Sequence, residues 1–546
     1  MRVTKGAQIV AGTALLALAV AACGGGASDS GGTAAGGGDS TPVRMEIGEP
    51  QELLVPQNTT ETEGSEVLAA LFSPLVSYDE EKQPVEEAAE SVTTEDSKVW
   101  TIKLKSGYTW HDGTAVTAAD YARAWNYAAL QDNAMSASYF FGRIDGYEDV
   151  HPGEGKKPTA KEMKGLKVVD DLTLEVTLAA PFSQFKTMLG YTAFYPLPES
   201  AIGPDGKVTQ AYGEQPIGQG MFKLDKPYKK GTDATIEASV YDKFPGKKPS
   251  NWTKLQFKVY TSAETAYNDL QAENLDVDDS LPPSAIASAK AALGDRYFDE
   301  ADASIGYIGV PLKYNPDFQD VQVRRAISLA IDRKTIAETV FSGTRAPADD
   351  FINPAIPGYR AGACDACTYN PAEAKKLYDE AGGPKTIEIG YNADGGHKEW
   401  IEAVANNLRA NLGIEVTPKP FEKFQGILDA LDAKEYKGLF RMGWAIDYPA
   451  AENYLTPIFG TGAITSGSNY GGYSNKEFDE LIKKGDQATD AAEGLKFYQQ
   501  ADDILIKELP YIPVYFYRSN FGHSTKVKNV KLNLLNQIDW ADVEKA

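Results

Sequence analysis

Cys364 and Cys367 lie three positions apart in Ala-Cys-Asp-Ala-Cys-Thr, a spacing that suits thiol chemistry. A C-x-x-C pair can serve thiol–disulfide exchange, supply half of a zinc site, or form a local disulfide. Zinc is disfavoured, because the sequence holds no second pair and no histidine within the usual ligand spacing. The choice between exchange and a structural disulfide depends on whether the compartment is reducing or oxidising.

The first 22 residues have the pattern of a secretory signal. Arg2 and Lys5 precede an uncharged, largely apolar stretch, residues 6–22, which is marginal in length for a membrane span. The stretch ends in Val-Ala-Ala-Cys, which resembles the lipobox of bacterial lipoproteins. That resemblance implies cleavage before Cys23 and acylation of its thiol, and two or more acyl chains give stable anchoring. A plain secretory signal with an incidental cysteine is the alternative.

Residues 23–42 are expected to form a flexible tether, since residues 24–40 are almost all Gly, Ala, Ser, Thr and Asp. The expected location is the cell membrane, with the protein lipid-anchored on the extracytoplasmic face. This environment is oxidising, so a disulfide between Cys364 and Cys367 is the expected state. Such a small loop contributes only about 2 kcal/mol and constrains the chain locally.

The length and charge of the chain limit its function classes. The 546 residues, less the signal, suggest about three domains, and no later apolar run is long enough to span a bilayer. A formal net charge of −23 argues against binding to nucleic acid or to anionic lipid surfaces. We expect a monomer whose contact with the membrane is made through its lipid anchor alone.

The sequence carries none of the common enzyme motifs. It lacks His-Glu-x-x-His, Gly-x-Ser-x-Gly and a phosphate-binding Gly-rich loop with Gly-Lys-Ser/Thr. The four histidines are far apart, and His111, in Trp-His-Asp-Gly, is best explained as part of a turn. We therefore expect no catalytic residues, no metal site and no cofactor, and keep a secreted lipoprotein enzyme as a remote alternative.

The C-terminal half alternates between strand and helix patterns. Residues 386–391 are predicted to be a strand, 397–411 a helix stopped by Gly413, and 414–417 a second strand. This βαβ unit implies a parallel pair and an α/β architecture. Residues 323–341 have apolar residues at helical spacing, and the pair Thr117 and Asp120 predicts a helix start by a capping box.

Several segments, in order along the chain, together resemble the large solute-binding proteins of ABC importers, known as bacterial extracellular solute-binding proteins, family 5. This family includes lipoproteins that bind oligopeptides and dipeptides. Each segment alone is a weak signal, whereas the ordered set is specific. The segments are residues 100–120 with Ser-Gly-Tyr-Thr-Trp-His-Asp-Gly-Thr, 216–224 with Pro-Ile-Gly-Gln-Gly-Met-Phe-Lys-Leu, 315–333, 370–382, 473–479 and 508–513 with Glu-Leu-Pro-Tyr-Ile-Pro.

The resemblance implies an α/β, two-lobed periplasmic-binding-protein-like fold (type II, large cluster) with an extra domain inserted in the N-terminal lobe. Two crossing strands would join the lobes, and a ligand would close the cleft by hinge motion for recognition by the transporter. The expected division is signal peptide 1–22, tether 23–42, lobe I formed by 43–72, 196–304 and 514–546, inserted domain 73–195, and lobe II 305–513.

Arg441-Met-Gly-Trp444-Ala-Ile-Asp447-Tyr448 resembles the motif Arg-x-Gly-Trp-x-x-Asp-Tyr of the family's peptide binders at every fixed position. Carried over, Asp447 holds the α-ammonium of the ligand, Arg441 reaches the carboxylate of short peptides, and Trp444 and Tyr448 belong to the same site. A desolvated ammonium needs such a partner. Alternatively, Trp444 is a core residue and Asp447 only caps a turn. Residues 449–452 depart from the family pattern, which affects pocket shape and ligand length.

The expected function is therefore capture of extended peptides with a free N-terminus in an interlobe cleft and their delivery to the permease subunits of an ABC transporter. An oligosaccharide or other small solute bound by the same fold is the main alternative, because fold alone does not determine the ligand. A sugar site would need stacked aromatic rings and no ammonium partner.

The anchor prediction can be tested by replacing the acylated thiol. Cys23→Ser is expected to release the protein into the medium or to leave it as uncleaved precursor, because the lipid can no longer be attached. Fractionation of cells followed by mass measurement of the mature N-terminus distinguishes these results. A variant that stays membrane-bound and is processed normally would show that Cys23 is not the anchor.

Overall fold

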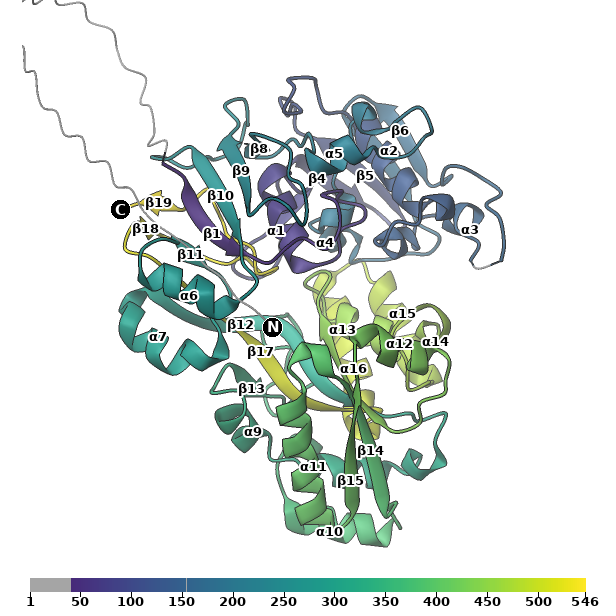
Figure 1. The fold of residues 1–546 in the computed structure, drawn as a ribbon. Coiled ribbons are helices and arrows are strands. Elements are labelled where there is room, and N and C mark those ends of the chain that lie inside the picture. Colours follow the sequence, from purple (N-terminus) through teal and green to yellow (C-terminus); the bar gives the residue numbers. More distant parts are fainter. Residues whose placement is uncertain (1–40, 154) are drawn as a thin grey trace, which may run out of the picture. The chain divides into compact units, whose positions relative to one another are not determined.

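Two long strands run through the centre of the largest sheet (Figure 1). The computed structural model describes residues 41–153 and 155–546, so Cys23, the predicted signal and almost all of the predicted tether lie outside the described residues. Eleven described strands form this sheet, in the order β15-β14-β16-β12-β17-β11-β1-β10-β9-β8, with β13 paired to β17. Their bounds are β1 Val43–Ile47, β8 Phe222–Leu224, β9 Thr235–Val240, β10 Lys254–Val259, β11 Val277–Asp278, β12 Tyr297–Gly309, β13 Arg345–Pro347, β14 Thr386–Asn392, β15 Glu415–Phe421, β16 Leu439–Ala445 and β17 Tyr511–His523.

The central strands β12 and β17 are antiparallel and connect two hydrophobic cores. One end of β17 contributes Phe521 to the first core, and the other end contributes Ile512 to the second, together with Ile308 of β12. Between the cores, residues 299–301 of β12 are exposed, and the pairing shifts register between Ala301 and Ile305. Exposed side chains and a register shift weaken the strand pair at this point, which therefore separates the two lobes of the fold.

The first core is built on a sheet with parallel strands at its centre. β1 pairs in parallel with β10 and β11, and a second sheet of four strands, β4-β5-β7-β6, packs with α2 into the same core. The backbone N–H of Thr117 donates to the Asp120 carboxylate at 2.9 Å, so the predicted helix start is confirmed. The bounds of the predicted domains stay a prediction. Further elements of this half are α1 Thr62–Leu71, β2 Val76–Tyr78, β3 Pro84–Glu86, β4 Ala89–Thr94, β5 Val99–Leu104, α2 Ala118–Ala129, α3 Tyr147–Val150, β6 Leu166–Asp170, β7 Thr173–Thr177, α4 Phe185–Met188, α5 Gln210–Glu214, β18 Val527–Lys528 and β19 Glu544–Lys545. The helices α6 Ala263–Gln271 and α7 Ile286–Leu293 pack in a small third cluster that includes Leu270 and Leu293.

The second core contains the predicted βαβ unit. β14 and β15 are parallel, α11 (Lys398–Leu412) connects them, and Gly413 ends the helix with a φ of 69°. The prediction of this unit from the sequence is confirmed. The other helices of this half are α8 Val321–Leu329, α9 Arg333–Thr339, α10 Pro371–Glu380, α12 Phe424–Asp432, α13 Glu452–Phe459, α14 Ala463–Ser466, α15 Lys476–Gln487 and α16 Ala491–Glu508.

The continuous helical pattern predicted for residues 323–341 is wrong, because the structure breaks it into α8 and α9. The Asp332 carboxylate accepts a hydrogen bond from the backbone N–H of Thr335 at 3.0 Å and so caps a new helix. The next residue, Arg333, is 3% exposed and turns into the core. Its guanidinium donates to the backbone carbonyls of Ser328 and Pro513 at 2.9 and 2.8 Å.

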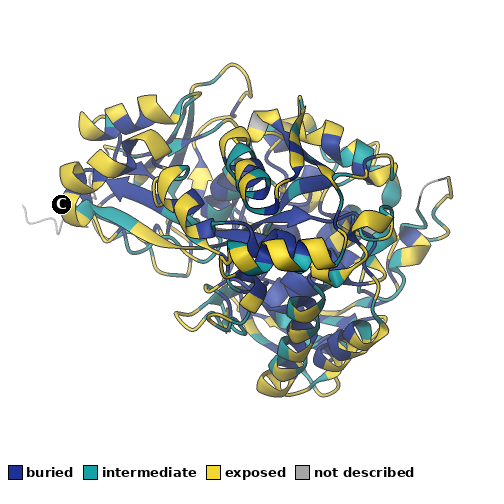
Figure 2. Cartoon of the chain, turned by 90° about the horizontal axis from the view of Figure 1, so that it is seen from below, coloured by how far each residue is buried: buried dark blue, intermediate teal, exposed yellow. Residues whose placement is uncertain are grey.

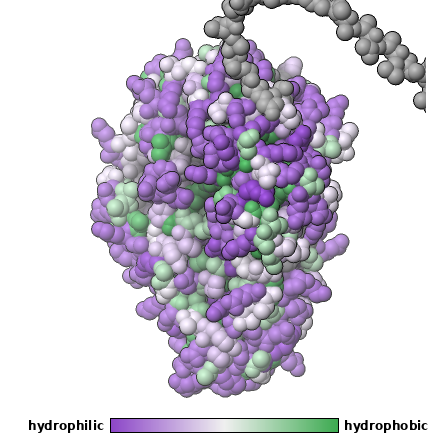
Figure 3. All heavy atoms as spheres, turned by 90° about the vertical axis from the view of Figure 1, so that its left-hand side faces the viewer, coloured by the Kyte–Doolittle hydropathy of each residue, from purple (hydrophilic) through white to green (hydrophobic). Residues whose placement is uncertain are grey.

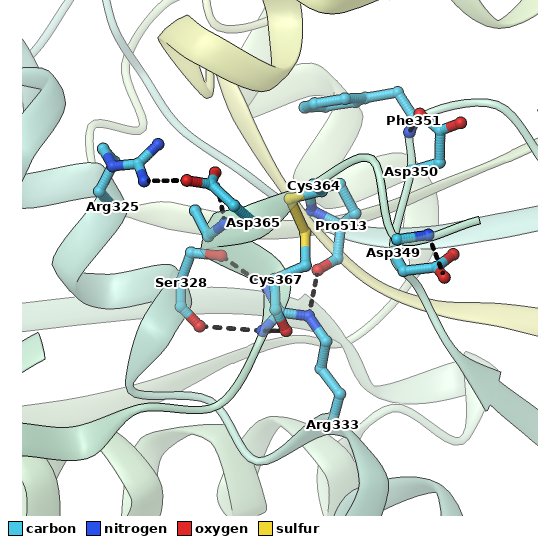
Figure 4. The surroundings of a disulfide bond; sticks show 12 residues. Arg325, Ser328, Arg333, Asp349, Asp350, Phe351, Cys364, Asp365, Cys367 and Pro513 are labelled. Carbon is cyan, nitrogen blue, oxygen red and sulfur yellow. Dashed lines mark hydrogen bonds and ion pairs between the residues drawn. A yellow bond between two sulfur atoms is a disulfide. The ribbon is translucent and has the colours of Figure 1, made fainter. Parts of the chain in front are cut away.

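The structure joins Cys364 and Cys367 in a disulfide (Figure 4) with Cα atoms 5.2 Å apart. Arg333 also donates to the carbonyl oxygen of Cys367 at 3.0 Å, so one buried side chain ties the disulfide loop, the end of α8 and the start of β17 together. Burial lowers the pKa of Arg333 to about 9, since no carboxylate of the described residues pairs with it. Nothing in this arrangement exposes the sulfur atoms, since Cys364 is 2% exposed and Cys367 7%.

The surface is polar over most of the described residues. Strands are buried between helices whose outer faces are exposed (Figure 2), and the face in Figure 3 is mostly hydrophilic with hydrophobic residues in small groups. None of the described helices combines the length and the apolar composition that crossing a bilayer requires.

Candidate functional site

Strand β16 and the loop after it carry all four residues of the predicted site. β16 lies antiparallel to β12, with Arg441 opposite Ile308 and Trp444 opposite Ile305. On its other edge β16 pairs in parallel with β14, but only at Leu439 and Phe440. From residue 441 to 445 no described strand covers this edge, so backbone N–H and C=O groups there are available to an extended ligand.

The carboxylate of Asp447 is held by two neutral donors. Asn453 Nδ2 donates to one oxygen at 3.1 Å, and the Tyr139 hydroxyl donates to the other at 3.4 Å. Asn453 Oδ1 in turn accepts from the backbone N–H of Asp447 at 2.9 Å and from Trp444 Nε1 at 3.1 Å. No Lys, Arg or His nitrogen of the described residues lies within 4.0 Å of this carboxylate. Burial therefore raises the pKa of Asp447 to about 6.

A cavity of about 820 Å³ opens beside Asp447. Trp444 and Tyr448 line it, so the structure brings three of the four predicted residues together, whereas Arg441 is not part of the lining. Its apolar wall includes Phe140, Met188, Pro457 and Ile482. Such a mixed lining, apolar with a few fixed polar groups, is typical of small-molecule sites.

Arg441 lies on the same strand but faces different neighbours. Its Nη1 donates to Asn392 Oδ1 at 3.3 Å, and its guanidinium lies 5.7 Å from the centre of the Phe424 ring. Its Nε is buried and has no hydrogen-bond partner in the described part of the chain. No carboxylate oxygen of the described residues lies within 4.0 Å of Arg441, so this cation can accept an anionic group.

Tyr448 has a structural contact that the sequence did not indicate. It is 5% exposed, and its hydroxyl donates to the Glu452 carboxylate, which is 0% exposed. The ring reaches the cavity, while the hydroxyl points to the charge network behind it.

Arg143 holds that network and comes from the distant residues 73–195. It pairs with Glu452 at 2.8 Å and with Asp486 at 3.3 Å, and it stacks 3.6 Å from the centre of the Phe182 ring. Sequence reasoning missed Tyr139, Arg143, Glu452 and Asn453. The first two lie about 300 positions from their partners, which leaves no local pattern in the sequence, although Asn453 follows closely after the recognised motif.

His111 has no free nitrogen to offer for catalysis. Nδ1 accepts from the backbone N–H of Gly218 at 3.1 Å, so the proton is on Nε2, which contacts the Gly220 carbonyl at 3.3 Å. Burial lowers the pKa of His111 to about 4. A Cβ atom at Gly218 would lie 2.0 Å from the Leu71 carbonyl oxygen, so glycine is required for this close packing.

Removing Arg143 should weaken the contact between its segment and α13. In Arg143→Met, Glu452 and Asp486 lose their cation, and breaking a buried pair of this kind costs about 3–5 kcal/mol. Because Arg143 is itself 33% exposed, we expect a smaller loss of about 1–3 kcal/mol, visible as a lower melting temperature. Adding Glu452→Gln to Arg143→Met should restore part of the lost stability, because it removes one of the two carboxylates left without a cation.

The matched control is Lys164→Met, which removes a cation from an exposed pair with Asp145 and should leave the melting temperature unchanged. An Arg143→Met protein that melts at the wild-type temperature would contradict the structural role of this pair.

Three relatives show what kinds of ligand similar chains bind. The dipeptide-binding protein DppE of Bacillus subtilis is 28% identical over 484 residues, covering 85% of this chain and 84% of its own. The probable deoxycholate-binding periplasmic protein YgiS of Escherichia coli is 29% identical over 476 residues, with 85% of each chain covered. The periplasmic oligopeptide-binding protein OppA of Escherichia coli is 28% identical over 470 residues, with 83% of each covered.

Solved structures of the same architecture agree with the fold. OppA of Haemophilus influenzae, crystallised with the peptide RPPGFSPFR, has a TM-score of 0.72 and 24% identity, and the match covers 93% of this chain and 99% of that one. The model of the family described as bacterial extracellular solute-binding proteins, family 5 Middle, matches residues 83–466. The predicted two-lobed α/β fold is confirmed, and the chain belongs to the bacterial extracellular solute-binding proteins, family 5.

Proposed function

We propose that this protein captures peptides with a free N-terminus in the cavity beside Asp447 and delivers them to an ABC transporter. The observation that carries the proposal is the Asp447 carboxylate, which lines the cavity and has no cationic partner among the described residues. A peptide's α-ammonium supplies the missing charge and can donate to both carboxylate oxygens. The dipeptide and oligopeptide binders among the relatives support this ligand class.

The uncovered edge of β16 gives the peptide backbone a place to pair. Residues 441–445 lack a described strand on the β14 side, and an extended peptide added there would gain main-chain hydrogen bonds regardless of its side chains. Asp447 follows this edge directly, which places an ammonium group next to the end of the added strand.

Arg441 would then bind the terminal carboxylate of short peptides. Asp447 lies six positions after Arg441, which corresponds to at most about 20 Å of extended chain. A peptide longer than about six residues would place its carboxylate beyond this guanidinium. Arg441 has no carboxylate partner among the described residues, which supports this role.

Other ligand classes fit the site less well. A steroid acid such as the one named for YgiS carries a carboxylate, and the cation in the lining of this cavity, Arg143, is already engaged by Glu452 and Asp486. An oligosaccharide would leave the Asp447 charge unpaired. The one histidine that the sequence singled out, His111, lies outside this cavity and has both ring nitrogens engaged by the backbone, and the family is one of solute-binding proteins, so a binding role is favoured over an enzymatic one.

We further propose that the protein is a monomer held at the extracytoplasmic face of the cell membrane by acylated Cys23. Relative motion of the lobes would occur at residues 299–305 of β12, where residues 299–301 are exposed and the pairing shifts register between Ala301 and Ile305. Binding across the lobes would favour the closed form that the transporter recognises.

Asp447→Asn tests the ammonium site. The substitution keeps the shape and removes the charge, and truncating one side of a buried charge pair costs about 2–5 kcal/mol. At about 1.4 kcal/mol per tenfold, affinity for free peptides should fall roughly thirtyfold or more. Calorimetry with peptides of two to six residues, first identified by native mass spectrometry from a mixture, measures this loss.

Two controls make the result specific. Asp479→Asn removes another carboxylate of the cavity wall that is already hydrogen-bonded by Thr461, so affinity should stay near wild type. N-acetylated peptides should bind wild type as weakly as free peptides bind Asp447→Asn. Equal binding of acetylated and free peptides to wild type would refute the ammonium site and favour the sugar alternative.

Peptide affinity should also depend on pH in a defined direction. Asp447 has a raised pKa of about 6 in the free protein and must be ionised to pair with an ammonium. Binding favours the ionised form, so affinity should fall as pH drops below about 6, by up to tenfold per pH unit, and again above about 8, where the α-ammonium loses its proton. Titration from pH 4.5 to 9 tests this. In Asp447→Asn, the fall in affinity below pH 6 should be absent. A wild-type affinity that stays constant below pH 6 would contradict the pairing of Asp447 with the ammonium.

A further inference from the structure

Three carboxylates meet at the ends of two neighbouring parallel strands, outside the cavity described above. Glu46 is on β1 and Asp278 on β11, and because Met45 pairs with Val277 the two residues lie side by side in the sheet. Asp279 follows directly. One carboxylate oxygen from each of Glu46, Asp278 and Asp279 lies within 4.8 Å of the others. Like charges side by side on neighbouring strands destabilise a sheet unless something neutralises them.

No described side chain supplies the neutralising charge. Within the described residues, no Lys, Arg or His nitrogen comes within 4.0 Å of these three carboxylates or of the neighbouring Glu66, which is 2% exposed. Asp276, two positions before Asp278, is different, since it pairs with Arg44 at 3.5 Å. The sheet thus compensates one buried carboxylate and leaves the adjacent group uncompensated.

One carboxylate oxygen of Asp278 is buried without a hydrogen-bond partner among the described residues. The residue is 0% exposed, its Oδ1 accepts from the backbone N–H of Ser280 at 3.2 Å, and its Oδ2 is buried with no hydrogen-bond partner in the described part of the chain. A buried carboxylate oxygen without a partner costs free energy that a bound cation would recover.

We propose that Glu46, Asp278 and Asp279 form a binding site for one divalent cation of the calcium type. All three ligands are carboxylate oxygens, which hard cations prefer, and no histidine or cysteine is present to favour zinc. Ligand oxygens up to 4.8 Å apart fit a central ion with bonds of about 2.3–2.6 Å. Backbone carbonyls and water would complete the coordination.

The cation would stabilise the first lobe where it meets a central strand. β11 carries Asp278 and pairs with β17 at Val277–His523 and Asp278–Gly522, while Glu66 reaches the same place from α1 and accepts from the backbone N–H of Ile538 at 3.3 Å. An ion bound here would hold β1 and β11 together at that point, independently of ligand capture beside Asp447.

The test is a thermal-unfolding titration of the purified full-length chain, first stripped with a chelator. At 1 mM free Ca²⁺ and constant ionic strength we expect the wild-type melting temperature to rise by about 3 °C or more. Calorimetry with CaCl₂ should give one site. Asp279→Asn and Glu46→Gln should each abolish the response, and in chelator each should melt no lower than wild type, because a repelling charge has been removed.

Asp276→Asn is the matched control. It removes a nearby buried carboxylate that already pairs with Arg44, so the response of this variant to Ca²⁺ should persist. A wild-type protein that shows neither heat nor a melting shift with Ca²⁺, Mg²⁺ or Mn²⁺ would overturn the proposal. So would a response retained in both Asp279→Asn and Glu46→Gln, or one reproduced by NaCl at matched ionic strength. If arginine-containing peptides bind through Glu46 while Ca²⁺ has no effect, the cluster recognises ligand side chains instead.

Discussion

The antiparallel pairing of β12 with β17 is the constraint on which the rest of the structure depends. Both strands enter both cores, so each lobe is completed by the same two segments. The two sites are attached to opposite ends of this pair: β16, with Arg441 and the Asp447 loop, pairs with β12, and β11, with Asp278, pairs with β17. The register shift between Ala301 and Ile305 lies between these attachments.

Charged side chains in this protein fall into two groups, those whose charge is satisfied within the chain and those whose charge is not. Arg333 is satisfied by backbone carbonyls and Arg143 by two carboxylates, so neither has capacity for a ligand. Asp447 has only neutral donors, and Glu46, Asp278 and Asp279 have one another. Since an uncompensated buried carboxylate is costly, these positions are where the protein gains most from an external cation.

The sequence indicated the parts of the fold that are encoded locally. The βαβ unit, the Thr117 helix start and the β16 motif each depend on residues within about thirty positions. The break between α8 and α9 was missed because Asp332 interrupts a continuous apolar pattern, and capping outweighs periodicity there. Tyr139, Arg143 and the acidic cluster were missed for another reason, since their partners are more than 200 positions away. The expectation of no metal site came from a search for closely spaced histidine and cysteine ligands, which cannot detect carboxylates brought together by strand pairing.

The return of the chain to its first core has a consequence for biosynthesis. Phe521, Trp540 and Val543, near the end of the polypeptide, pack into the core that begins with Val43. The first lobe therefore stays incomplete until residues 521–543 have been made, although its sheet contains β1. Contacts of such long sequence separation form slowly. Because a ribosome makes the chain N-terminus first, the first lobe can complete its core only after the residues of the second core have been synthesised.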